Sequence, residues 1–320
     1  MPSHPLENPF HEQRKRDSDR SDFFGTVLGS KEKNAKKHKT APVEDWNEKL
    51  NVSEGEQNTI EEEKIISDLM EQERLALRKF FGKEIHVPPL PPEITVEKIK
   101  AWEALDLRLH YLPPENLAEI KRDENGTIID VQPKNFPGWK KKPENWFFKQ
   151  IKDGKLPPRS AQLPGAWVLI DSRSKPVFRD GIQKYPNDFL GPSLEELNKK
   201  GIIEQRANNG THLDVDSRYG ISADELSKKS VRKAVAQAMN IPEEYVSLPR
   251  AIEFNILGNI YYLEWGETNT AEIFEDRFNG VCLVGGCSRN GGLSQVRPEG
   301  KDDRYLDLGF RVMGRFFDRG

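Results

Sequence analysis

The spacing of hydrophobic positions changes sharply near residue 65. Residues 1–60 are rich in Lys, Glu, Asp, Asn and Ser and have no apolar period, so we expect a disordered tail that cannot bury enough surface to offset its ordering entropy. Apolar residues then recur at helical spacing: Ile66, Leu69, Met70, Leu77, Phe80 and Phe81. This pattern predicts one amphipathic helix, which either docks on the main domain or joins a partner helix.

Proline and aromatic residues dominate the segment that follows. VPPLPPE (87–93) is typical of a stiff extended connector, since each proline fixes φ and removes an amide donor. Thr95 is suited to cap a short helix that runs through Trp102. We therefore expect residues 61–110 to be a helical and Pro-rich segment, and residues 111–162 to be an irregular connector rich in Pro, Lys and Trp.

A folded domain is predicted for residues 163–320. AWVLID (166–171) is a short apolar run typical of a buried strand. Capping boxes predict two helices, one opened by Ser193 with Glu196 and ended by Gly201, the other opened by Ser222 with Glu225.

The last seventy residues change from helical to strand-like patterns. Pro249 suits the first turn of a short helix and Gly258 its end. Four short β-like runs follow: NIYYLEW, GVCLVGG, LSQV and YLDLGFRVM. Glycine stands at nearly every junction, which indicates turns and bulges in a small twisted sheet. The pattern as a whole predicts the α+β class.

Composition narrows the class of partner. The chain is 35% hydrophobic and 32% charged, against averages of about 45–50% and about 25%, which fits a chain with a long unfolded part. A net charge of −3 gives no general attraction to polyanions, so a nucleic-acid role would depend on a local patch such as Lys31 to Lys39. A solvated run of charge is the simpler interpretation of that patch.

Cysteine content and hydropathy bear on the compartment. Two cysteines cannot build a disulfide framework, and no run approaches the roughly 18 consecutive apolar residues that a membrane helix needs. We expect a protein of the reducing cytoplasm without a membrane segment.

Four short phrases in the C-terminal half occur in a familiar order: SLPRAIEF (247–254), TNTAEIF (268–274), CLVGGCS (282–288) and DLGFRV (307–312). They resemble phrases of the formylglycine-generating enzyme and sulfatase-modifying factor superfamily. The resemblance implies a C-type-lectin-like domain with small twisted antiparallel sheets and flanking helices.

The residues of these phrases also have structural interpretations of their own. Pro249 fixes a helix start, and Glu253 can accept hydrogen bonds from backbone amides or from a nearby arginine, with Arg311 as the hypothetical buried partner. Glycines are expected where the backbone bends or crosses closely: Gly285, Gly286 and Gly309.

The resemblance also sets an expectation about chemistry. Formylglycine-generating members hold copper between two thiols that follow the glycine phrase, whereas RNGGLSQV at that place contains no cysteine. Cys282 and Cys287 lie before and within the glycine phrase, so we expect neither oxidase activity nor a cofactor. Asn269 and Glu272 match positions where some members bind calcium, and they are candidate calcium ligands. The alternative is a turn in which Asn269 caps and Glu272 satisfies backbone amides.

Three functions remain open. The first is a non-catalytic recognition domain that binds a protein, peptide or small ligand through loop residues: Glu264, Trp265, Arg289, Asn290 and Arg297. The second is a divergent enzyme of the same superfamily with changed chemistry. The third is an accessory nucleic-acid- or ribosome-associated factor that acts through the basic tail and through Trp139 and Trp146.

Overall fold

The computed structural model describes residues 54–179 and 183–317, with residues 54–57 described for the backbone alone. The tail expected at residues 1–60 lies almost wholly outside the described residues, and the basic segment from Lys31 to Lys39 lies wholly outside them. Contacts between residues group Ser53–Gly320 into one compact unit.

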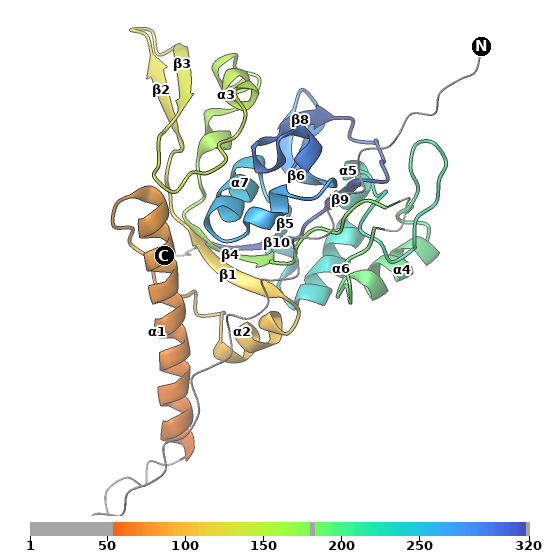
Figure 1. Cartoon of the computed structure of the whole chain (residues 1–320). Helices are drawn as coiled ribbons and strands as arrows, with labels where there is room; N and C mark the ends of the chain where they lie inside the picture. The colour runs from red at the N-terminus through yellow and green to blue at the C-terminus, as the bar shows by residue number, and fades with distance from the viewer. Residues whose placement is uncertain (1–53, 180–182, 318–320) are drawn as a thin grey trace, which may run out of the picture. The chain divides into compact units, whose positions relative to one another are not determined.

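Seven α-helices and ten β-strands are formed by the described residues (Figure 1). The helices are α1 (Glu54–Phe81), α2 (Val96–Glu103), α3 (Asn145–Lys152), α4 (Gly191–Lys199), α5 (Ala223–Leu226), α6 (Lys229–Met239) and α7 (Ala251–Ile260). The strands are β1 (Leu107–Leu112), β2 (Ala118–Arg122), β3 (Ile128–Pro133), β4 (Ala166–Asp171), β5 (Val246–Ser247), β6 (Ala271–Phe278), β7 (Val281–Gly285), β8 (Val296–Glu299), β9 (Leu308–Phe310) and β10 (Met313–Phe316).

The strands are arranged in three small sheets. One antiparallel sheet has the order β1-β4-β10-β5, and β2 pairs with β3 in a separate hairpin. The third sheet has the order β8-β7-β6-β9, in which β6 and β9 are parallel and the other pairs antiparallel. The predicted α+β class with small antiparallel sheets is confirmed, with this one parallel pair as the exception.

β4 is an interior strand of the first sheet. All six of its residues are buried, and β1 and β10 pair with it on either side. A strand covered on both faces reads as a continuous apolar run, which is why AWVLID could be recognised as a buried strand.

The C-terminal half of α1 docks on this sheet. Leu77 and Phe80 are buried in the core, and Glu73 accepts a hydrogen bond from the backbone of Tyr111 in β1. Of the two alternatives for the amphipathic helix, docking on the domain is confirmed.

Segments that the sequence placed before the domain are part of its core. β1 pairs with β4 along its whole length, from Leu107 opposite Asp171 to Leu112 opposite Ala166. The indole of Trp139 donates to Asn255 Oδ1 of α7 at 2.9 Å. The contacts of the described residues therefore show no domain boundary at residue 163. The sequence did not reveal this, because the paired strands are about sixty positions apart and their pairing leaves no local pattern.

Several helix boundaries differ from their predictions. Ser222 and Glu225 form the predicted capping box, but the helix they open ends at Leu226, and α6 is a separate helix. α4 begins at Gly191, with a proline in its first turn, so Ser193 lies inside the helix and does not cap it.

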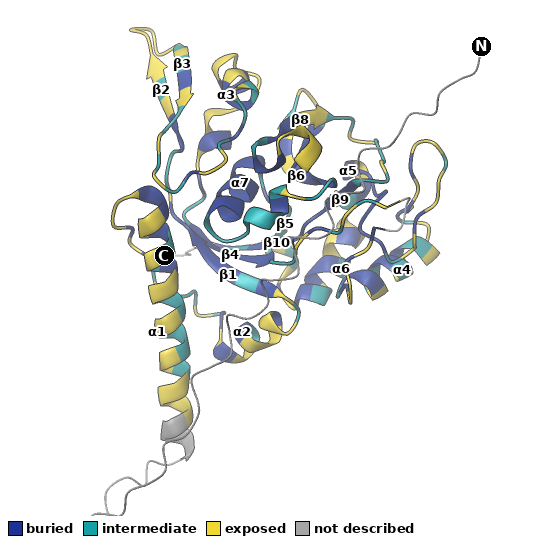
Figure 2. Cartoon of the chain, in the orientation of Figure 1, coloured by how far each residue is buried: buried dark blue, intermediate teal, exposed yellow. Residues whose placement is uncertain are grey.

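α7 is the central helix of the domain. Nine of its ten residues are buried, and most of the helix is dark blue in Figure 2. Pro249 lies two residues before its first residue, and Gly258 lies within it. The run NIYYLEW, predicted as a strand, continues α7 and then forms a 3-10 helix (Leu263–Gly266), because a short buried apolar run suits either structure.

The predicted glycines lie where the chain crosses itself closely. Gly286 has a φ of +89°, and a Cβ atom there would lie 2.8 Å from Lys175 Nζ. A Cβ atom at Gly309 would lie 2.9 Å from the ring of Tyr219, and one at Gly285 would overlap the carbonyl oxygen of Gln295. The glycine phrase therefore permits close packing of backbone, as its sequence indicated.

Candidate functional site

A cavity of about 580 Å³ lies beside β1, between α1, α2 and the end of α7. We call it the edge pocket, because β1 is the edge strand of its sheet. Its polar lining includes Glu73, Glu103, Arg108, His110, Tyr261 and Tyr262, and its apolar lining includes Leu69, Ile99, Leu109, Leu169 and Ile260.

Glu73 anchors the polar side of the pocket. This carboxylate is 3% exposed and accepts three hydrogen bonds: from His110 Nδ1 at 2.9 Å, from the Tyr111 amide at 3.0 Å and from the Tyr261 hydroxyl at 2.7 Å. A buried carboxylate needs such donors, since it has lost its hydration. The Glu73 side chain therefore fixes both the imidazole and the edge of β1.

His110 links Glu73 to a second tyrosine. Its Nε2 lies 2.6 Å from the Tyr262 hydroxyl, and its ring stacks on Tyr261 with centroids 3.9 Å apart. With the Nδ1 hydrogen directed at Glu73, Nε2 accepts the phenol hydrogen, which assigns the tautomer from the hydrogen-bond network. Burial raises the pKa of Tyr262, so its phenol stays protonated.

Arg108 lies on the same strand and lines the pocket. Its Nη1 donates to the carbonyl oxygens of Glu103 and Leu107, both at 3.1 Å. Eight arginines of the described residues are buried or half-buried, and seven of them form ion pairs with carboxylates: Arg74, Arg173, Arg218, Arg250, Arg304, Arg311 and Arg315. Arg108 is the exception.

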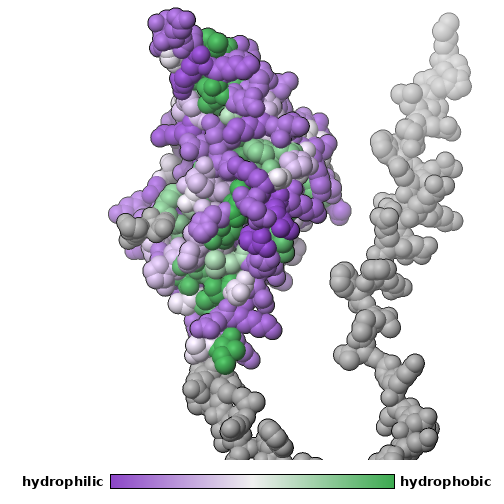
Figure 3. Space-filling view, turned by 90° about the vertical axis from the view of Figure 1, so that its left-hand side faces the viewer, coloured by the Kyte–Doolittle hydropathy of each residue, from purple (hydrophilic) through white to green (hydrophobic). Residues whose placement is uncertain are grey.

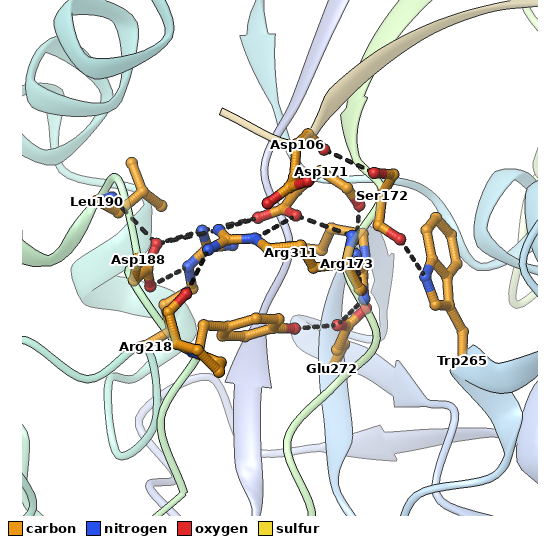
Figure 4. Close-up of polar contacts among 12 residues, drawn as sticks. Asp106, Asp171, Ser172, Arg173, Asp188, Leu190, Arg218, Trp265, Glu272 and Arg311 are labelled. Carbon is orange, nitrogen blue, oxygen red and sulfur yellow. Dashed lines mark hydrogen bonds and ion pairs between the residues drawn. The ribbon is translucent and has the colours of Figure 1, made fainter. Parts of the chain in front are cut away.

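A second cluster of polar side chains is buried in the domain, and we call it the ionic network (Figure 4). It contains three arginines and three carboxylates: Arg173, Arg218, Arg311, Asp171, Asp188 and Glu272. Arg218 joins both aspartates, with Nη2 at 2.7 Å from Asp171 Oδ2 and 2.6 Å from Asp188 Oδ1. Burial opposes ionisation of Asp171, but the charge of Arg218 and the hydrogen bond from Arg173 outweigh it and hold the pKa well below its usual range.

Arg311 is fully buried and every part of its guanidinium is occupied. Nη2 and Nε donate to Glu272 at 2.9 and 3.1 Å, and Nη1 donates to the carbonyls of Asp171 and Arg173. The guanidinium also lies 3.9 Å from the ring centroid of Trp265. The hypothetical pair with Glu253 is wrong.

Glu253 has two other arginines as partners. It accepts from Arg250 Nε at 2.9 Å and from Arg315 Nη2 at 2.7 Å. Arg250 lies just before the first residue of α7, and Arg315 lies on β10. The kind of interaction was predicted correctly, and the partner was not.

The candidate calcium ligands have other roles. Glu272 is fully buried and holds Arg311, while Asn269 Oδ1 accepts from the Phe178 amide at 2.8 Å. Among the residues that the structure describes, no group of three or more His, Cys, Asp and Glu side chains is arranged to hold a metal ion.

The residues predicted to bind ligand lie on different elements and differ in exposure. Trp265 is fully buried and donates to the Ser172 carbonyl at 3.3 Å, so it offers no surface to a ligand. Arg289 and Asn290 are exposed on a 3-10 helix (Ser288–Asn290), where Arg289 pairs with Asp307 at 3.0 Å. Glu264 is half-buried in its 3-10 helix, and Arg297 is exposed on β8 beside Glu299.

Both thiols face the core. Cys282 and Cys287 are free and buried, in a cluster with Ala271 and Ile273. Burial raises the pKa of Cys282 to about 11, so its thiol is not ionised near neutral pH and is a poor nucleophile or metal ligand.

The sequence missed a buried lysine beside the glycine phrase. Lys175 Nζ donates to the Thr270 carbonyl at 2.7 Å and to the Gly286 carbonyl at 2.6 Å, so it ties the start of β6 to the end of β7. Burial lowers its pKa to about 8. In the sequence Lys175 follows a polar run, DSRS (171–174), and nothing in that pattern indicates a buried position.

The tryptophans of the connector pack against other parts of the domain. Trp139 is buried, with Lys142 Nζ 5.7 Å from its ring centroid, and Trp146 packs on Phe278. Because its indole is buried, Trp139 cannot stack on a base.

Comparison with known proteins gives no relative: no protein family, no curated protein and no solved structure matches the chain. Among the described residues, every helix is too short or too polar to cross a lipid bilayer.

Proposed function

We propose that the protein is a recognition module that binds a small ligand in the edge pocket without changing it chemically. The carrying observation is the cavity of about 580 Å³, in which polar groups from α1, β1 and the end of α7 converge above an apolar floor. Cavities of this size with a few oriented polar groups are typical of small-molecule sites.

We also propose that the domain carrying this pocket is a sulfatase-modifying-factor-like domain with a C-type-lectin-like fold. Support comes from the order of its elements. SLPRAIEF opens α7, CLVGGCS includes the end of β7, and DLGFRV leads into β10, which returns to pair with β4. A scaffold does not fix a task, so the recognition function stands on the pocket and not on the resemblance.

A small ligand is favoured over a protein partner by the surface around α1. Figure 3 views the side that bears α1 and the β2–β3 hairpin, and the described part of this face is mainly hydrophilic with small, separate hydrophobic areas. Protein interfaces usually have a larger continuous apolar centre.

An unbiased fragment screen tests the proposal. A library of neutral and charged fragments is added to the full chain, and amide shifts are followed by NMR. We expect shifts to concentrate at residues that line the edge pocket, and to vanish in Ala76→Trp, which fills the cavity. Leu75→Trp, at an exposed neighbouring position of α1, is the matched control and keeps them. Shifts concentrated at Arg289 and Asn290 would move the site to the loop predicted from the sequence.

A divergent enzyme is the second candidate, and one observation favours it. The hydrogen-bonded series Tyr262, His110 and Glu73 has the order of a hydroxyl, a base and an orienting carboxylate. Fragment hits recovered chemically intact after long incubation support recognition. Turnover of a hit that is lost in His110→Gln, with the fold retained, supports the enzyme.

A further inference from the structure

We propose that the ligand of the edge pocket is an organic acid: a monocarboxylate with an apolar or aromatic body. This inference rests on the proposed function and adds the chemical class of the ligand. Its carboxylate is held by Arg108 and by the backbone amide of Leu109, and its body lies against the apolar floor that includes Ile99 and Leu169.

The first support is the unmatched charge of Arg108. Two backbone carbonyls hold Nη1, so the guanidinium is oriented, while Nε and Nη2 have no partner among the described residues. A half-buried guanidinium with free donors suits a carboxylate, which it can bind through two parallel hydrogen bonds. The seven other buried or half-buried arginines show what this fold does with such a charge, since each has a carboxylate.

The second support is a free strand edge inside the cavity. The amide of Tyr111 points away from β4, because it donates to Glu73. In an antiparallel pair, backbone groups alternate between the two sides of a strand, so the amide of Leu109 points the same way. Leu109 lines the pocket, and no strand of the described residues pairs with this edge of β1. Its N–H is therefore a second donor for an anion.

The remaining charges of the pocket define the kind of acid. Glu73 and Glu103 are also in its lining, and they oppose any second negative charge, so a phosphate dianion is disfavoured. The phenol of Tyr262 donates its hydrogen to His110 and can accept one from the ligand, as an amide N–H would provide. An N-acylated amino acid with an aromatic side chain has all of these features.

A matched pair of compounds tests the inference on the full chain. N-acetyl-L-phenylalanine and its carboxamide differ only in the carboxylate, and their affinities are measured by titration calorimetry. We expect the acid to bind at least tenfold more tightly than the carboxamide. Arg108→Gln should remove that preference, while Arg108→Lys keeps part of it. An unchanged melting temperature shows that the Arg108 variants fold.

The outcomes separate this inference from the proposed function. Equal affinities for the two compounds, or a preference that survives in Arg108→Gln, overturn the organic acid while the pocket remains a binding site. If neither compound binds but fragments are still detected in the pocket, the organic acid is again overturned and the pocket remains a binding site. If fragments also avoid the pocket, both proposals fail.

Discussion

The ionic network and the edge pocket are both polar and largely buried, yet they use their polar groups in opposite ways. In the network, three arginines meet three carboxylates, and the guanidinium of Arg311 has every donor nitrogen bonded within the protein. Among the network's buried side-chain nitrogens that the structure describes, only Nη1 of Arg218 lacks a hydrogen-bond partner, although the same guanidinium pairs with two carboxylates. In the pocket, Arg108 keeps two donor nitrogens without partners and Leu109 offers an open amide beside a cavity.

This contrast distinguishes structural polarity from functional polarity. A buried charge that is fully matched by its own chain has nothing left to offer a ligand, however unusual its pKa. Donors left unmatched next to empty space indicate an external partner. The perturbed pKa of Asp171 therefore marks structure, and the geometry around Arg108 marks a site.

The largest expected effect is in the network. Arg311→Met leaves the Glu272 carboxylate buried without its partner and should lower the free energy of unfolding by about 3–5 kcal/mol. Denaturant unfolding measures this. Arg289→Met, which removes an exposed pair with Asp307, should change stability by less than about 1 kcal/mol. A small loss in Arg311→Met would break the comparison, because the network would then not be structural.

Asp276 gives a pH-dependent test of buried charge in the same half. It accepts the Ala251 amide at 2.7 Å, and burial raises its pKa to about 6, above the value of 3.8 for an unperturbed carboxyl. The folded state binds the proton more tightly, so this stabilisation is complete below pH 3.8 and is lost as the pH rises through about 6, a change of about 3 kcal/mol. Asp276→Asn should remove that part of the pH dependence. Parallel stability curves for both proteins between pH 4 and 7 would contradict it.

A pair of glycine variants tests the crossing beside Lys175. Gly286 and Gly280 have φ values of +89° and +84°, but only Gly286 has neighbours within contact distance of an added Cβ. Gly280→Ala should cost about 1 kcal/mol from backbone strain alone, and Gly286→Ala about 2 kcal/mol or more because Lys175 and Phe254 must also move. Equal losses in thermal unfolding would show that the crossing is not tight.

A small effect on stability is expected in the pocket. Tyr262→Phe removes the hydrogen bond to His110 Nε2 and should lower the free energy of unfolding by only about 1 kcal/mol, because it deletes one hydrogen bond and keeps the aromatic ring in place. If Tyr262→Phe loses 3 kcal/mol or more in chemical unfolding, the cluster of Tyr262, His110 and Glu73 is structural, like the ionic network, and the pocket is not a binding site.

Local signals in the sequence were sufficient for several elements. Ser222 and Glu225 lie three positions apart and form a capping box, Thr95 caps α2, and AWVLID matches β4 residue for residue. In each case the interacting groups are neighbours in the chain, so their spacing carries the information.

The site could not be found in this way. His110 lies 37 positions from Glu73 and 152 from Tyr262, and in the sequence it was one of several scattered histidines. Arg311 is 39 positions from Glu272, and Glu253 was an equally reasonable partner for it. Contacts between distant segments depend on topology, above all on the pairing of β1 with β4, which no local pattern encodes.

The bond from the Tyr111 amide to Glu73 has a further consequence. Unprotected outer strands recruit other chains and seed aggregates. The two edge strands of this sheet are β5 and β1. β5 is only two residues long, which is too short to pair with another chain, and α1 lies against the longer edge strand, β1, through the bond from Tyr111 to Glu73. A fragment that begins after α1 would expose this outer strand and lose the core residues Leu77 and Phe80, and it should therefore self-associate.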